Sequence, residues 1–170
     1  MAPERVPTGY EASFEPAMRE ALAEAAAASS AAGSAAGSAS SADVPVGAVI
    51  LDAAGTVLAR GRNRREADGD PTAHAEIVAI RAAAEAIGGW RLDGLTLVVT
   101  LEPCTMCAGA ITAARLSRLV FGAPDARAGA VGSLWDVVRD QRLTPIPEVI
   151  GGVLGDESLK IIRTFFQERR

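Results

Sequence analysis

The sequence predicts an α/β fold in which helices cover both faces of a mixed β-sheet. Three observations lead to this prediction. The chain has 170 residues, enough to bury one core. Short apolar runs of strand length alternate with longer segments of helical spacing, and the first two strands follow one another directly, as in a hairpin. The predicted order, α-β-β-α-β-α-β-(β)-α, is that of a single domain covering residues 1–170.

The N-terminal part contains one predicted helix and one segment without predicted structure. Residues 11–28 are rich in alanine and leucine, with apolar side chains four residues apart, which indicates a helix. Residues 29–41 contain almost only alanine, serine and glycine, which cannot bury enough surface to offset chain entropy. We therefore predict a flexible insertion between an N-terminal helix region, 1–28, and a catalytic core, 44–170.

The core elements follow from apolar periodicity and from turn residues. Thr72 is a candidate N-cap for one helix, and Gly88-Gly89 would end that helix. Pro103 suits the first position of the next helix. The predicted elements are strands at 46–51, 56–61, 95–100, 119–121 and 149–153, a polar loop at 60–70, and helices at 72–87, 103–114, 133–138 and 157–168.

Every histidine and cysteine of this chain falls into one pair of motifs. The one histidine and the two cysteines lie in His74-Ala75-Glu76 and Pro103-Cys104-Thr105-Met106-Cys107. An imidazole and two thiolates supply three protein ligands, and a tetrahedral zinc ion with three protein ligands keeps one position for water, which is the catalytic arrangement. Glu76 could handle the protons of that water without binding the metal. The sequence thus predicts one Zn²⁺ per subunit and a catalytic Glu76.

Both motifs lie at predicted helix starts. Cys104 and Cys107 are three residues apart, so they share one face of a first turn. The partial positive charge at a helix N-terminus favours the thiolate that zinc requires. Two alternatives remain for the cysteines: a redox pair, or half of a structural site with four cysteines, for which the chain has no second pair.

The two motifs together are the signature of zinc-dependent nucleobase deaminases. The longer blocks around them resemble those of the TadA-type bacterial tRNA-specific adenosine deaminases, in the cytidine-deaminase-like superfamily. The resemblance covers residues 44–170. The matching blocks are Val44-Pro45-Val46-Gly47-Ala48, residues 70–77 (DPTAHAEI), residues 100–110 (TLEPCTMCAGA), Val120-Phe121-Gly122-Ala123 and residues 129–134 (GAVGSL).

The resemblance implies a cytidine-deaminase-like three-layer α/β/α fold with a mixed five-stranded sheet, and a homodimer. It implies hydrolytic deamination of adenosine to inosine at the wobble position of a tRNA anticodon stem-loop, that of an arginine tRNA. In such a protein Asn63 would hydrogen-bond the nucleoside and Asp125 would lie near the anticodon backbone. The remaining matched residues are Val44 and Pro45, which would wall the base pocket, and Phe165 and Phe166, which would lie near the tRNA.

Simpler interpretations of these residues stay open. Asn63 could cap a turn, and Asp125 could be a turn residue after Pro124. One of Phe165 and Phe166 should belong to the core, because helix neighbours point about 100° apart. The arginines could either hold phosphates or form a solvated loop; they are Arg60, Arg62, Arg64 and Arg65.

Composition restricts the remaining classes of function. The net charge of −4 argues against a protein that coats nucleic acid indiscriminately. The longest apolar run, 95–101, is too short for a membrane span, and the N-terminus does not read as a signal peptide, so we expect a cytoplasmic protein. Two alternatives to the tRNA deaminase are a deaminase of a free base or nucleoside, of guanine or cytosine type, and a non-catalytic zinc module.

Overall fold

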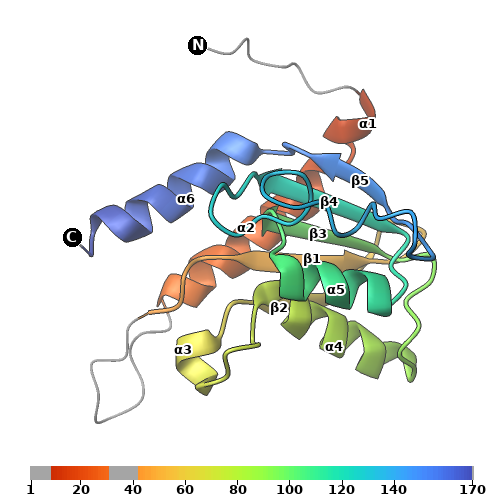
Figure 1. Cartoon of the computed structure of the whole chain (residues 1–170). Coiled ribbons are helices and arrows are strands. Elements are labelled where there is room, and N and C mark those ends of the chain that lie inside the picture. The colour runs from red at the N-terminus through yellow and green to blue at the C-terminus, as the bar shows by residue number, and fades with distance from the viewer. Residues whose placement is uncertain (1–8, 31–41, 170) are drawn as a thin grey trace.

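A computed structural model describes residues 9–30 and 42–169, and a five-stranded mixed sheet forms its centre (Figure 1). The strand order is β2-β1-β3-β4-β5. β1 (Gly47–Leu51) pairs antiparallel with β2 (Val57–Arg62) and with β3 (Thr96–Leu101). β3, β4 (Arg118–Ala123) and β5 (Glu148–Gly151) run parallel. The predicted mixed sheet is confirmed.

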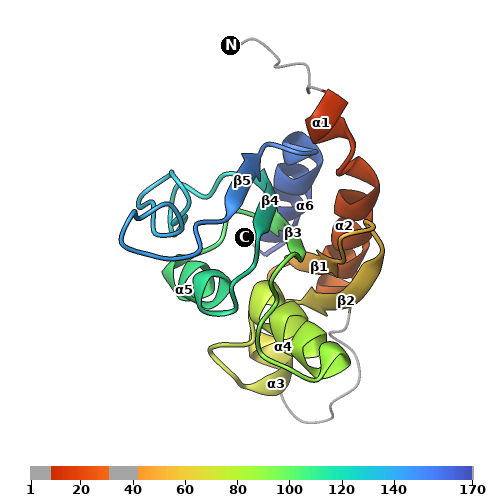
Figure 2. The same cartoon turned by 90° about the vertical axis from the view of Figure 1, so that its right-hand side faces the viewer.

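Two pairs of helices cover the two faces of the sheet (Figures 1 and 2). α2 (Glu15–Ser30) and α6 (Gly155–Gln167) lie on one face, and α4 (Ala75–Ile87) and α5 (Thr105–Ala113) lie on the other. The short helices are α1 (Gly9–Ala12) and α3 (Arg65–Asp68). Among the described residues, no helix is long and apolar enough to cross a membrane.

The central strands are buried on both faces, and their side chains alternate between two apolar clusters. Ile50 and Leu97 belong to the cluster under α4 and α5, whereas Val49 and Val98 belong to the cluster under α2. Because β3 and β4 are parallel, the loops that follow them leave the sheet at the same edge. This edge carries Cys104 from one loop and Asp125 from the next.

Two glycines bring helices into backbone contact with the β1–β2 hairpin. A Cβ at Gly47 would overlap backbone atoms of α2, and a Cβ at Gly61 would overlap the carbonyl of Ala75 and the amide of Ala79 in α4. Neither overlap can be relieved by rotating a side chain, so these positions require glycine. The contact at Gly61 fixes the start of α4, which follows His74 directly.

The predicted helix at 11–28 is wrong in one respect, because the chain forms two helices there. Pro16 has no amide hydrogen and would clash with the carbonyl of Ala12 in a continuous helix. The chain therefore turns at Ser13 and Phe14, buries Phe14 and begins α2 at Glu15.

The predicted starts of the two helices of the site are also wrong by two or three residues. The Thr72 amide and hydroxyl both donate to Oδ1 of Asp70, at 2.8 and 2.7 Å, so Thr72 belongs to a turn and His74 occupies the N-cap position of α4. Similarly, Cys104 is the N-cap of α5, and Pro103 precedes the helix. The predicted end of α4 is confirmed, with Gly88 in the left-handed conformation.

Two further segments differ from the prediction. Residues 133–138 form turns and not a helix, because the Val137 amide bonds the Ala130 carbonyl and Val131 forms a bridge with Asp136. The polar loop at 60–70 contains α3. The segment predicted to be flexible, 29–41, lies outside the described residues except for its first two, which end α2.

Candidate functional site

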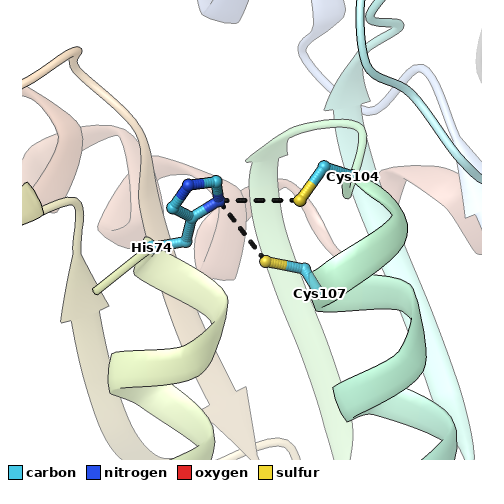
Figure 3. Close-up of side chains that lie close together, drawn as sticks. All are labelled: His74, Cys104 and Cys107. Atoms are coloured by element: carbon cyan, nitrogen blue, oxygen red, sulfur yellow. Dashed lines mark hydrogen bonds between the residues drawn. The ribbon is translucent and has the colours of Figure 1, made fainter. Parts of the chain in front are cut away.

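The three soft ligands converge at the starts of two helices on one face of the sheet. Nδ1 of His74 lies 3.7 Å from Sγ of Cys104 and 3.6 Å from Sγ of Cys107. Figure 3 shows the imidazole, just before α4, facing the two sulfurs at the start of α5. The three atoms all lie within 4.8 Å of one another. The two motifs, about thirty residues apart in sequence, therefore form one cluster.

This geometry fits zinc. A tetrahedral ion with Zn–N bonds of about 2.0–2.1 Å and Zn–S bonds of about 2.3 Å holds its nitrogen and sulfur ligands about 3.6 Å apart, as found here. Across residues 9–30 and 42–169, the cluster has three members and no fourth protein ligand. A site of this kind keeps one coordination position for water or substrate.

The sulfurs of the two cysteines lie close together, and the pKa values of their thiols shift in opposite directions. The Cys107 thiol donates to the Cys104 sulfur, which lowers the pKa of Cys104 to about 3 and raises that of Cys107. A divalent cation replaces the thiol proton, since thiolates are the form that binds metal.

Glu76 is buried beside the cluster, in the first turn of α4. Burial raises the pKa of its carboxyl group to about 6. Its carboxylate accepts a hydrogen bond from its own backbone amide, so acceptor positions remain on the carboxylate. The group is not one of the three clustered ligands, which agrees with a role in proton transfer.

A cavity of about 150 Å³ opens beside these residues. This volume is well below the roughly 300–1,000 Å³ of sites for drug-sized ligands, so the cavity suits one small planar group. Its lining includes His74, Glu76 and Cys104. The other lining residues are Val44, Val46, Asn63, Arg65, Ala75, Leu101, Glu102, Asp125 and Ala128.

Of the residues expected to contact substrate, Val44, Asn63 and Asp125 line this cavity. The Asn63 side chain donates from Nδ2 to the Val44 carbonyl at 3.1 Å, and its Oδ1 accepts from the Arg65 amide at 3.4 Å. The second hydrogen of Nδ2 is left for a ligand. Oδ1 of Asp125 accepts from the Arg127 amide at 2.8 Å, so this side chain also stabilises its turn.

The other three expected residues do not line the cavity. Pro45 and Phe165 line a groove between α2 and α6. Phe165 is buried and Phe166 is exposed, which confirms that one of the pair belongs to the core. The Arg169 guanidinium lies 3.6 Å from the centre of the Phe165 ring. Phe165 and Arg169 also line a smaller hollow that shares Val44, Asn63 and Arg65 with the cavity.

The four arginines near the cavity differ in their partners. Arg60 pairs with Glu20, Arg62 with Glu24 and Arg64 with Asp68, so their charges are matched within the chain. In the described part of the chain, Arg65 has no acidic group within ion-pair distance, and it lines the cavity. Of the four arginines named above as possible phosphate contacts, Arg65 is therefore the one whose charge is available to a ligand.

Glu102 lines the cavity as well, and its sequence position gave no indication of its role. Its buried carboxylate accepts hydrogen bonds from the amides of Asp125, Val131 and Ser133, at 2.9, 2.9 and 3.0 Å, and from the Ser133 hydroxyl. Burial alone would raise the pKa of this carboxyl group, but the four hydrogen bonds lower it below its ordinary value. These partners are 23–31 residues away, beyond the reach of a local motif.

Known proteins share both the motifs and the fold. The model of the cytidine and deoxycytidylate deaminase zinc-binding region matches residues 15–123. A tRNA-specific adenosine deaminase of Haemophilus influenzae is 49% identical over 128 residues, which cover 75% of this chain and 74% of that protein.

Solved structures agree. One from a study of A-to-I editing by tRNA:A34 deaminases at the wobble position of transfer RNA has a TM-score of 0.74 and 43% identity, and covers 85% of this chain and 96% of that one. A guanine deaminase from Bacillus subtilis has a TM-score of 0.56 and 36% identity, and covers 65% of this chain and 64% of the other.

Proposed function

The chain belongs to the zinc-binding cytidine and deoxycytidylate deaminase family, within it to the tRNA-specific adenosine deaminases, and we propose on this premise that it converts adenosine to inosine in tRNA. The observation that carries the proposal is the shared cavity: the ligand cluster and the buried Glu76 face one hollow large enough for a single base. Enzymes that react at a base must take it out of the stack, so a one-base cavity is the form of site that this chemistry needs.

His74, Cys104 and Cys107 would hold the zinc ion. When bound, zinc lowers the pKa of a water molecule toward neutrality and so supplies a nucleophile. Glu76 accepts one proton from the water through its carboxylate and transfers it to a ring nitrogen, while the water oxygen bonds to the carbon that bears the amino group. Glu76 then accepts the second proton of that oxygen and transfers it to the amino group, which leaves as ammonia. The net reaction is adenosine plus water to inosine plus ammonia. Glu76 is buried, which limits the access of other water to this proton transfer.

The walls of the cavity would orient the base. Val44 offers an apolar surface, and Asn63 has one amide hydrogen available for the nucleoside. Arg65, unlike its three neighbours, is available to a phosphate. Asp125 also lines the cavity, and a neighbouring nucleotide would pass beside it. Pro45, Phe165 and Phe166 would contact the RNA outside the cavity, beyond the hollow that Phe165 shares with it.

Three finer points belong to the same proposal. The substrate is the wobble adenosine of an arginine tRNA, and the enzyme works in the cytoplasm, where tRNA is matured and used. The protein acts as a homodimer, for which Leu134 and Trp135 offer exposed apolar surface. Light scattering on the purified protein would report the mass of the assembly directly, and the mass of one chain would contradict the dimer.

The decisive experiment compares substrates under one set of conditions. The zinc-loaded protein is incubated with anticodon stem-loops carrying adenosine at the wobble position, including that of arginine tRNA, and separately with guanine, cytosine and cytidine. Mass spectrometry detects inosine or the deaminated base. We expect inosine in the arginine stem-loop and little reaction of the free bases. Faster turnover of guanine or cytosine would overturn the proposal, and equal rates on all stem-loops would remove the arginine assignment.

A further inference from the structure

Glu102 lines the cavity next to a loop that contributes two further lining residues, Asp125 and Ala128. The loop runs from Asp125 to Ser133 and follows β4, whereas Glu102 follows the neighbouring parallel strand β3. The carboxylate accepts four hydrogen bonds from this loop, described above, and is 3% exposed. The loop therefore wraps one buried side chain and has no regular structure of its own.

The backbone around this carboxylate leaves no space for another side chain. A Cβ at Gly129 would lie 2.5 Å from Oε2 of Glu102 and 2.5 Å from the Asp125 carbonyl oxygen. The Ala130 amide donates to the Pro103 carbonyl at 2.8 Å, and Gly129 forms a bridge with Cys104. The loop is thus joined both to the Glu102 side chain and to the segment that carries a metal ligand.

We propose that Glu102 is a positioning residue, which sets the distance between the zinc side of the cavity and the wall formed by Asp125 and Ala128. Both wall residues line the cavity, and the loop that holds them is bound to the Glu102 carboxylate at its two ends, through Asp125 and Ser133. The four hydrogen bonds that its carboxylate accepts all come from this loop. Its effect on the reaction passes through the loop.

The expected consequence is a change in substrate binding and not in chemistry. The proposal rests on the proposed function, since the wall is taken to contact the RNA. If the loop is released, His74, Cys107 and Glu76 keep their places on α4 and α5, so kcat should change little. Contacts between the wall and the RNA that are equally strong in the ground state and in the transition state would be lost, and their loss raises KM.

The test is Glu102→Gln, which keeps the shape but places an NH₂ group against backbone amides. A matched control is Asp52→Asn, because Oδ1 of Asp52 accepts from the amides of Ala54 and Thr56 at 2.9 Å in the β1–β2 turn, at the opposite end of β1 from the cavity. For each protein we would measure zinc content, kcat and KM on the stem-loop, and hydrogen exchange at the loop amides.

Glu102→Gln should retain one zinc per chain, keep kcat within about twofold and raise KM at least about fivefold, with faster exchange at Asp125, Val131 and Ser133. Asp52→Asn should leave KM unchanged. A lower melting temperature with unchanged KM and kcat would show a merely structural role and overturn the proposal. Loss of zinc with unchanged KM would overturn it too, because Glu102 would then support the metal.

A second variant and an activity-independent measurement cover the two cases in which Glu102→Gln alone would not decide. If Glu102→Gln does not fold, Ser133→Ala removes one of the four donors at an exposed residue and should raise KM in the same direction by a smaller factor; an unchanged KM contradicts the proposal. If the wild-type protein does not act on the stem-loop, the proposed function fails, whereas the exchange rates still decide the role of Glu102: unchanged rates at the three amides overturn it.

Discussion

Two buried glutamates lie on the same cavity, and their surroundings differ. Glu76, in the first turn of α4, keeps acceptor positions open, and burial raises the pKa of its carboxyl group to about 6. Glu102, after β3, uses its carboxylate to hold four donors of one loop, and the pKa of that group is lowered. Both side chains are almost fully buried by exposed area, but burial dominates the pKa of Glu76, whereas four hydrogen-bond donors outweigh burial at Glu102.

This difference divides the site into a chemical side and a binding side. The chemical side consists of α4, α5 and their N-caps, where a group must exchange protons. The binding side consists of the loops at 63–69 and 125–133, where backbone has to be held still. Variants on the first side should lower kcat, and variants on the second should raise KM.

Removal of zinc should have the largest effect. Dialysis against a chelator should abolish deamination, because the three ligands then have no ion with which to activate water. Activity should fall in proportion to the zinc content, measured by atomic emission. Restoring Zn²⁺ should restore activity, and Mg²⁺, which prefers oxygen ligands, should not. Full activity in zinc-free protein would contradict the chemical side as described.

The substitution Glu76→Gln should have the second-largest effect on deamination. The variant keeps the shape of the side chain but cannot accept a proton, so kcat should fall by at least about 10²–10⁴-fold. Zinc content should remain one per chain, because Glu76 is not among the clustered ligands. Inosine formation measured by mass spectrometry provides the rate. A variant with nearly normal kcat would show that another group moves the proton.

Arg65→Ala tests the binding side with an intermediate effect. We expect about a tenfold weaker affinity for the stem-loop and a salt dependence reduced by about one unit of slope, as for the loss of one phosphate contact. Arg60→Ala is the matched control, since Arg60 is already paired with Glu20. Filter binding at several salt concentrations measures both. Equal effects of the two variants would mean that only the total charge matters.

Asp43→Asn should have the smallest effect and shows whether a second carboxylate acts as Glu102 does. Asp43 is buried, and its carboxylate accepts from the amides of Glu66 and Ala67 at 2.8 and 3.2 Å, which caps α3. Loss of such a cap costs about 1 kcal/mol, or about 2–4 °C in Tm for a chain of this size. Thermal unfolding measures the stability and steady-state kinetics the KM, which should rise less than for Glu102→Gln. A larger rise would place the main control of the binding side at α3.

The sequence predicts the ligand cluster of the chemical side well and the shape of the loops on the binding side poorly. The motif His74-Ala75-Glu76 and the cysteine pair carry their chemistry in local spacing, and the sheet and its covering helices follow from periodicity. The loop at 129–134 is different. Its shape depends on hydrogen bonds to Glu102, which follows β3 and is distant in sequence, and the helix predicted at 133–138 does not form. Pro16 alone is sufficient to predict that the helix at 11–28 is divided, but the alanine-rich composition around it favoured a continuous helix.

The contact at Gly61 has a consequence for how this protein tolerates change. Both surfaces of that contact are main chain, so no change of side-chain rotamer could make room for a Cβ at Gly61. Any larger residue there would push the whole helix that carries Glu76, together with the imidazole just before it, as one rigid piece. The positions of the catalytic groups therefore depend on the absence of a side chain at Gly61, and not only on the residues that perform the reaction.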